Sequence, residues 1–182
     1  MPDALRRLIL DVPDFPKPGV MYKDFTPLLK DPGALALAVE LMANPYRGKG
    51  VKCVVGAESR GIKIGPSIPQ ELSTALVQAL SAGFVPIRKP GKLPRAVHAQ
   101  DYDLEYGSDR VELHADAIEP GDGVLLVDDL LATGGTLDAC GHLLKQCGAE
   151  LVGVTVLIEL EFLKGRERLE HLGDIHAVVQ YD

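Results

Sequence analysis

Val124-Leu-Leu-Val-Asp-Asp-Leu-Leu-Ala-Thr-Gly-Gly-Thr136 places two carboxylates and a glycine-rich turn directly after an apolar run. The four apolar residues predict a buried strand. A helical pattern follows from Gly135 to Cys147 and ends at Gly148, which suits a helix C-terminus. A strand, a glycine-rich turn and a helix in this order are typical of an α/β sheet, in which ligands bind beyond the carboxyl ends of the strands.

The turn within this segment has the chemistry of a phosphate site. Glycines let the backbone approach an anion, threonine hydroxyls donate hydrogen bonds, and a helix N-terminus adds positive potential. Asp128 and Asp129 suit sugar hydroxyls or a metal ion rather than a phosphate. The segment therefore predicts a ligand with a phosphate beside a sugar diol. It is neither a Walker loop nor a Gly-x-Gly-x-x-Gly dinucleotide motif.

The rest of the chain predicts the other elements of such a sheet. Pro13, Pro16 and Pro18 predict an irregular, extended segment that ends at Gly19. Because strands and helices alternate, we expect a mostly parallel sheet with helices on both faces. The loops after Val55, Arg88 and Val127 should then meet at its carboxyl edge. The other predicted strands are 51–55, 84–88, 102–106, 110–114, 151–158 and 177–181, and the other predicted helices are 3–10, 31–42 and about 62–80.

Composition narrows the class of protein. The 182 residues fit one domain, and the net charge of −7 disfavours binding to nucleic acid or to an anionic membrane. The longest apolar stretch, 151–158, is too short to cross a bilayer. The three cysteines, Cys53, Cys140 and Cys147, form no metal spacing, and the five histidines form none either. An odd number of unpaired thiols favours a cytoplasmic protein.

Four segments resemble the adenine phosphoribosyltransferases, which are type I phosphoribosyltransferases. The opening segment resembles their motif for 5-phosphoribosyl pyrophosphate (PRPP). Residues 14–32 resemble their base-binding segment, Glu58-Ser-Arg-Gly61 their pyrophosphate loop, and 84–94 with 104–107 their lid and the strand behind it. The resemblance implies the type I fold over 1–182, with a base-binding hood at about 1–33 and a flexible lid with its following strand at about 89–108. Residues 66–83 depart from the family by being several residues longer, with prolines in the expected helix.

The resemblance also implies the reaction and the site. Adenine and PRPP would give AMP and pyrophosphate with Mg²⁺, through an oxocarbenium-like transition state. The resemblance implies catalytic roles for Glu105, Asp128, Asp129 and Arg60. The residues implied to bind the 5′-phosphate are Ala132, Thr133, Gly134, Gly135 and Thr136, and those implied to bind the pyrophosphate are Ser59, Arg60, Arg88, Lys89 and Lys92. Adenine is implied to bind Met21, Tyr22, Lys23, Arg60 and Leu130. Mg²⁺ is expected to be held through the substrate, with Asp128 and Asp129 as the candidate protein ligands.

Two alternatives stay open at the level of sequence. One is a phosphoribosyltransferase for another base, since the choice of adenine follows from the resemblance alone. The other is a PRPP-binding regulator without catalytic activity, which the acidic charge, the lid cations and Glu105 disfavour. The resemblance further implies a homodimer.

Overall fold

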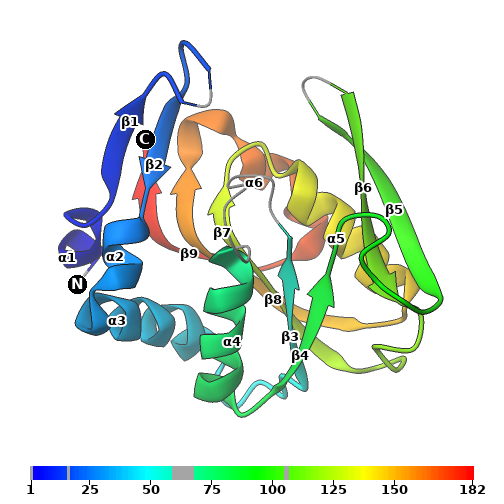
Figure 1. The fold of residues 1–182 in the computed structure, drawn as a ribbon. Coiled ribbons are helices and arrows are strands. Elements are labelled where there is room, and N and C mark those ends of the chain that lie inside the picture. The colour runs from blue at the N-terminus through cyan, green and yellow to red at the C-terminus, as the bar shows by residue number, and fades with distance from the viewer. Residues whose placement is uncertain (1, 16, 59–67, 105–106) are drawn as a thin grey trace.

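A five-stranded sheet forms the centre of the protein, seen in a computed structural model that describes residues 2–15, 17–58, 68–104 and 107–182. The strand order is β4-β3-β7-β8-β9, and every neighbouring pair is parallel, which confirms the predicted parallel sheet (Figure 1). The strands are β4 (Gly83–Ile87), β3 (Cys53–Ala57), β7 (Gly123–Leu131), β8 (Glu150–Leu160) and β9 (Ile175–Tyr181).

One face of the sheet is covered by α3 (Pro32–Ala43) and α4 (Ile68–Leu80), beside the short helices α1 (Pro2–Arg6) and α2 (Thr26–Lys30). Asp31 begins α3 as predicted, because its Oδ1 accepts a hydrogen bond from the Ala34 N–H at 2.8 Å. Pro32 follows at the first helical position, where no intrahelical donor is needed. The 3₁₀ turn η1 (Asn44–Tyr46) then carries the chain to the bottom of the sheet.

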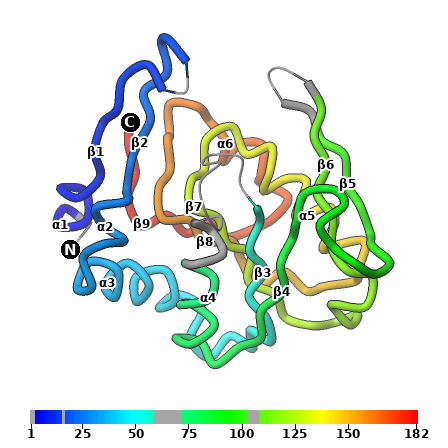
Figure 2. The backbone as a smooth tube through the Cα atoms, viewed as in Figure 1, coloured from blue at the N-terminus to red at the C-terminus, as the bar shows by residue number. Residues whose placement is uncertain are grey.

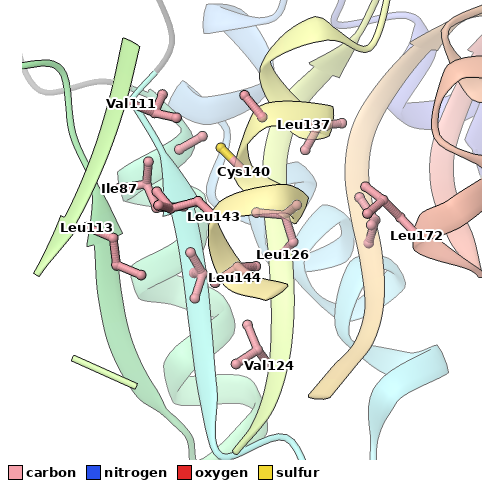
Figure 3. Close-up of a cluster of buried hydrophobic side chains, with 14 of the residues drawn as sticks. Ile87, Val111, Leu113, Val124, Leu126, Leu137, Cys140, Leu143, Leu144 and Leu172 are labelled. Carbon is pink, nitrogen blue, oxygen red and sulfur yellow. The ribbon is translucent and has the colours of Figure 1, made fainter. Parts of the chain in front are cut away.

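The other face is covered by α5 (Gly135–Gln146) and by the antiparallel hairpin of β5 (Val97–Leu104) and β6 (Gly107–His114). Figure 3 shows leucines of α5 directed at the sheet, with Val111 and Leu113 of β6 beside them. Leu126 and Leu143 are fully buried here, and burying such a side chain stabilises the fold by about 1.5–3 kcal/mol. This layer fixes the direction in which α5 leaves the glycine-rich turn.

A second hairpin joins β1 (Leu10–Pro13) to β2 (Met21–Asp24), where an irregular segment was predicted. The prolines do not prevent pairing because Pro13 lies at the end of its strand, where proline is tolerated. Asp14 and Gly19 adopt positive φ values of 57° and 85°, and the Gly19 N–H donates to Asp14 Oδ1 at 2.8 Å. In Figure 2 the two hairpins rise on opposite sides of the sheet.

Other element boundaries also differ from the prediction. Helix α1 ends at Arg6 rather than Leu10, and β5 and β6 are longer than 102–106 and 110–114. Strand β7 continues to Leu131 and so includes both aspartates. Between β8 and β9 the chain forms three short helices that were not predicted: η2 (Glu161–Leu163), α6 (Gly165–Arg168) and η3 (Glu170–Leu172). No helix in the described ranges is long and apolar enough to span a membrane.

Candidate active site

Asp128 and Asp129 lie near the carboxyl end of β7. Asp128 is 4% exposed, and its Oδ1 accepts a hydrogen bond from the Asp129 N–H at 2.9 Å. Burial raises the pKa of Asp128 well above its ordinary value, and the negative charge of Asp129 raises it further. Burial raises the pKa of Asp129 as well. Two carboxylates this close are stabilised by a proton, by a cation or by hydroxyl donors.

Successive side chains of a strand point to opposite faces, so the two aspartates address different parts of the site. Asp128 lies on the face covered by α5 and by the β5–β6 hairpin. Burial raises the pKa of Cys140 in α5, and the charge of Asp128 raises it further. On the same face, the charge of Lys89 lowers the pKa of Asp128. Asp129 lies on the face of the hood. There burial raises the pKa of Tyr22, and the charge of Asp129 raises it further.

The predicted phosphate-binding residues form a small hollow immediately after this pair. Ala132, Thr133 and Gly134 connect β7 to α5, and Gly135 is the first residue of the helix. Gly134 adopts φ +80°, a conformation that favours glycine. A cavity of about 80 Å³ opens here, lined by Asp128 and residues 130–137. The N-terminus of α5 thus faces a hollow where backbone N–H groups can meet an anion.

Helix α6 supports this turn from below, which sequence reasoning did not anticipate. A Cβ at Gly165 would meet the Ala132 carbonyl oxygen at 2.1 Å, so the position admits only glycine at this backbone spacing. A Cβ at Gly134 would meet the Gly165 carbonyl oxygen at 2.8 Å. Arg166 of α6 donates two hydrogen bonds to the buried carboxylate of Glu159, at 2.9 Å and 2.5 Å. No local sequence pattern marks Gly165, because the close approach is made by a distant part of the chain.

Lys89 lies where the lid meets the acidic pair. Its Nζ donates to Tyr102 Oη at 2.7 Å and also pairs with Asp109. Burial disfavours the ammonium charge, but these hydrogen bonds outweigh it and raise the pKa of Lys89. Burial likewise opposes the charge of Asp109, yet the contact with Lys89 lowers its pKa to about 2. Tyr102 and Asp109 were not predicted, since they follow no motif. The pairing of β5 with β6 sets them opposite each other, and the antiparallel bridge between Arg88 and Glu112 brings Lys89 to this hairpin.

Glu58 gathers the other lid cations. It accepts from Arg88 Nε at 3.1 Å and from the Lys89 backbone N–H at 3.0 Å, and it pairs with Lys92. Burial opposes its charge, but Lys92 and then the Lys89 N–H hold the pKa of Glu58 below its ordinary value. The Gly91 N–H donates to Glu112 Oε2 at 3.0 Å. The structure therefore brings Arg88, Lys89 and Lys92 together around carboxylates of the protein itself.

Of the predicted adenine-binding residues of the β1–β2 hairpin, Tyr22 lies near Asp129, whereas Lys23 makes other contacts. Tyr22 is half-buried, and Phe15 packs edge-on against it with ring centroids 5.1 Å apart. Met21 is 47% exposed. The Lys23 ammonium contacts Asp11 at 2.5 Å and lies 4.0 Å above the Tyr181 ring, so it points toward the strand edge of the hood.

Of the remaining predicted residues, Leu130 lies half-buried in β7 beside the phosphate turn. Ser59, Arg60 and Glu105 lie outside the described residues, as do most of the predicted pyrophosphate loop and the start of the segment 66–83, which was predicted to be longer than in the family. In the described part of α4, Pro69 is the second residue, where a helix tolerates proline.

Comparisons with known proteins agree with this geometry. A family model described as a phosphoribosyl transferase domain matches residues 28–179. An adenine phosphoribosyltransferase of Rhodopirellula baltica is 50% identical over 177 residues, covering 97% of this chain and 82% of the relative. The crystal structure of the enzyme from Rhodothermus marinus superposes with a TM-score of 0.89 at 47% identity, covering 99% of this chain and 98% of that one.

A third relative was solved with ligands. The adenine phosphoribosyltransferase of Saccharomyces cerevisiae, crystallised with D-2,5-dideoxy-2,5-imino-altritol 1,6-bisphosphate and adenine, superposes with a TM-score of 0.84 at 34% identity. The match covers 97% of this chain and 96% of the yeast chain. These relatives are all adenine phosphoribosyltransferases, and their similarity extends from the β1–β2 hairpin through the phosphate turn to β9. This chain therefore belongs to the adenine phosphoribosyltransferase family of phosphoribosyl transferases.

Proposed function

We propose that this chain transfers the 5-phosphoribosyl group of PRPP to adenine and releases AMP and pyrophosphate. One observation carries the proposal: the adjacent aspartates near the carboxyl end of β7 face lid cations on one side and the aromatic side chain of Tyr22 on the other, directly beside the phosphate turn. A phosphoribosyl group needs all three neighbours at once. Its phosphate, its leaving group and its incoming base lie on different sides of the ribose.

The ribose 5-phosphate is seated first in this scheme. Backbone N–H groups of 132–136 and the N-terminus of α5 hold the 5′-phosphate. The carboxylates of Asp128 and Asp129 then accept hydrogen bonds from the ribose hydroxyls. Because β7 is buried on both faces of the sheet and α5 is packed on one of them, the turn between them is anchored at both ends, and fixed positioning is a large part of catalysis in such reactions.

Bond breaking develops positive charge on the ribose and negative charge on pyrophosphate. The acidic pair interacts more strongly with the ribose in the transition state than in the ground state, because only the transition state carries the full positive charge. Arg88, Lys89 and Lys92, with Ser59 and Arg60 by family resemblance, take the pyrophosphate. In this structure Glu58 and Asp109 neutralise the lid cations, so pyrophosphate would replace protein carboxylates as their partner.

Mg²⁺ fits the chemistry of this site. Asp128 and Asp129 supply oxygen ligands, which Mg²⁺ prefers, and burial raises the pKa of both carboxyls, so a bound cation would favour their charged forms. When bound, Mg²⁺ would offset the negative charge of the pyrophosphate group. The same two residues orient the ribose hydroxyls.

Adenine is proposed to stack on Tyr22, with the backbone of Met21 along the base edge and Leu130 and Arg60 around it. The Lys23 side chain, which was predicted there, instead contacts Asp11 and the Tyr181 ring. Phe15 holds the Tyr22 ring edge-on, which limits its rotation. Glu105 is proposed as the general acid/base that moves the proton of the base as the glycosidic bond forms. The yeast relative binds adenine, which favours adenine as the base here.

AMP formation from PRPP and each of adenine, hypoxanthine, guanine and xanthine tests the proposal, first with Mg²⁺ and then with EDTA. We expect turnover with adenine alone and its loss in EDTA. Turnover with a different base would reject the adenine assignment. PRPP binding without turnover would reject catalysis in favour of a regulator.

The family resemblance also supports a homodimer. Light scattering coupled to size-exclusion chromatography would give a mass near twice the 19.5 kDa of the chain. A mass of one chain at all concentrations would contradict the dimer.

A further inference from the structure

A second cluster of ionisable groups lies away from the acidic pair, on the exposed side of α5. Asp138 and His142 are one helical turn apart on α5, and His171 of η3 lies beside them. Asp138 Oδ1 lies 3.2 Å from His142 Nδ1 and 3.2 Å from His171 Nε2. The three candidate ligand atoms all lie within 4.8 Å of one another.

These distances suit ligands that share one small cation. Zinc binds imidazole nitrogen and carboxylate oxygen at about 2.0–2.2 Å, which gives a tetrahedral edge of roughly 3.3 Å between neighbouring ligands. Both Asp138–histidine separations are close to that edge. The imidazoles are 52% and 45% exposed, so a metal ion can reach them from solvent and the rings can turn to close the third edge.

The carboxylate of Asp138 is already oriented to bind a metal ion through one oxygen, Oδ1. Arg168 Nε donates to the other oxygen, Oδ2, at 2.9 Å, and the Asp138 side chain is only 17% exposed. A partner of this kind fixes the ligand carboxylate and leaves Oδ1 directed at the two histidines. Arg168 thus has the place of a supporting residue for a metal ligand.

We propose that Asp138, His142 and His171 form a binding site for a divalent transition-metal ion of the zinc class. Imidazole nitrogen favours Zn²⁺ and its neighbours over Mg²⁺, which takes oxygen ligands in octahedral geometry. Three protein ligands leave a fourth position for water. The site is therefore distinct in ligand chemistry from the proposed Mg²⁺ site at Asp128 and Asp129.

The ion would join two segments that already pack under the phosphate turn. Asp138 lies in the first turn of α5, and η3 follows α6, whose Gly165 contacts Ala132. Leu172 of η3 also packs so tightly on Gly141 that a Cβ there would meet Leu172 Cδ2 at 2.3 Å. A metal ion between α5 and η3 would reinforce this contact, so we expect bound Zn²⁺ to raise the midpoint of thermal unfolding.

A hydrogen-bonded cluster without a metal is the competing interpretation. His142 Nδ1 also lies 2.9 Å from the Asp138 backbone carbonyl, a contact that a protonated Nδ1 makes by donating. The His142 and His171 rings lie 5.1 Å apart between centroids, which a purely structural pair can also adopt. No metal spacing is visible in the sequence, because the third ligand lies 29 positions beyond His142 along the chain.

Calorimetric titration of the untagged, metal-free chain with ZnCl₂ tests the site, with MgCl₂ as a parallel arm. We expect one Zn²⁺ per chain and no competition from Mg²⁺. His142→Gln and His171→Gln should each weaken binding by at least about tenfold, and Arg168→Gln by about 10- to 100-fold if it orients Asp138. His98→Gln, the same change in β5 away from the cluster, is the matched control and should bind like the unmodified chain.

The unmodified protein gives an independent measurement that does not depend on the variants folding. In NMR spectra of the imidazole nitrogens, one equivalent of Zn²⁺ should shift the signals of two of the five histidines. Zinc binding that survives in the His142→Gln/His171→Gln double variant would overturn the proposal, since other donors such as Cys147 would then be responsible. Absence of stoichiometric Zn²⁺ binding, or a shift of other histidines, would overturn it as well.

Discussion

Asp128 and Asp129 couple the chemistry of the site to the stability of the fold. A carboxyl that is almost completely buried beside a second acid is costly to ionise, and its raised pKa expresses that cost. The charge is tolerated because β7 is held on both faces and cannot turn the side chain out to water. The ligand-free protein is therefore expected to be less stable at neutral pH than its packing alone would make it.

Asp128→Asn should remove this destabilisation and reduce activity. Below the ordinary carboxyl pKa both the folded and the unfolded chain carry the proton, so Asp128 makes no pH-dependent contribution. As the pH rises, the unfolded chain releases the proton first and the folded state loses stability relative to it. The gain from Asp128→Asn should thus be larger at about pH 7.5 than at about pH 5, while kcat/KM falls by about 100-fold or more.

Urea unfolding of the ligand-free protein at the two pH values measures the gain. Asp116→Asn, which changes an exposed partner of Arg95, is the control and should show little dependence on pH. A gain for Asp128→Asn that shrinks as the pH rises would show that Asp128 does not carry a raised pKa.

At the scale of elements, predictability follows the range of the interactions that form each one. Helix α3 was predicted from its own Asp31-Pro32 start, and β7, β8 and β9 from apolar runs that need only burial. The β1–β2 hairpin was missed because Pro13 and Pro18 argue locally against pairing, whereas Asp14 and Gly19 supply the turn. Helix α6 was missed because its glycine is required by a carbonyl more than thirty positions earlier in the chain.

The lid gives a prediction about product binding. Glu58 forms ion pairs with Arg88 and Lys92 in the ligand-free protein, so its carboxylate would compete with pyrophosphate for the same cations. Glu58→Gln keeps an acceptor for the Lys89 N–H but removes the charge. Because partly exposed ion pairs contribute about 0–1 kcal/mol, we expect pyrophosphate to inhibit up to roughly fivefold more tightly. Product-inhibition kinetics would measure this, with Glu119→Gln, whose partner is Lys52, as control. Weaker inhibition in Glu58→Gln would refute the competition.

The support of the phosphate turn by α6 gives a prediction about substrate binding. Gly165→Ala would place a methyl group 2.1 Å from the Ala132 carbonyl oxygen and 2.9 Å from Leu131 Cδ1. The turn must shift, so we expect a loss of about 1–3 kcal/mol in stability together with a higher KM for PRPP. At Gly83 a Cβ meets its nearest atom at an ordinary 3.5 Å, which makes Gly83→Ala the matched control. An unchanged KM for PRPP in Gly165→Ala would show that the turn does not rely on α6.

At the scale of the whole molecule, the sequence predicted the parallel sheet because strands and helices alternate along the chain. Of the predicted meeting of the loops after β3, β4 and β7, the described residues show that Glu58, directly after β3, contacts Arg88 and Lys92 after β4. The sequence predicted the lid cations but not their partners. Asp109 and Glu112 of β6 are brought to Lys89 and Gly91 by an antiparallel bridge between Arg88 and Glu112, which are far apart in the sequence. The predicted roles of Ser59, Arg60 and Glu105 stay predictions, since these residues lie outside the described part of the chain.

The two layers of the fold are tied together at Tyr46, and this gives a prediction about stability at high pH. Tyr46 is 2% exposed and donates to the Val154 carbonyl oxygen at 2.7 Å, with its ring against Gly153, where a Cβ would lie 2.5 Å from Cε1. Burial, and then the charge of Asp174, raise the pKa of Tyr46 to about 12. The unfolded chain ionises this hydroxyl near its ordinary value of 10.0, whereas the folded chain keeps the proton.

Stability should therefore fall as the pH rises from about 10 to about 12, by roughly 2–3 kcal/mol from this residue. Tyr46→Phe removes that dependence but also removes a buried hydrogen bond, which costs about 1 kcal/mol at neutral pH. Denaturant unfolding across this pH range measures both effects. The Tyr181 hydroxyl is buried without a hydrogen-bond partner among the described residues, so Tyr181→Phe should cost little at neutral pH and serves as the control. If Tyr46→Phe lost as much stability above pH 10 as the unmodified chain, the alkaline unfolding would have to begin at other tyrosines, and Tyr46 would be only a packing residue between η1 and β8.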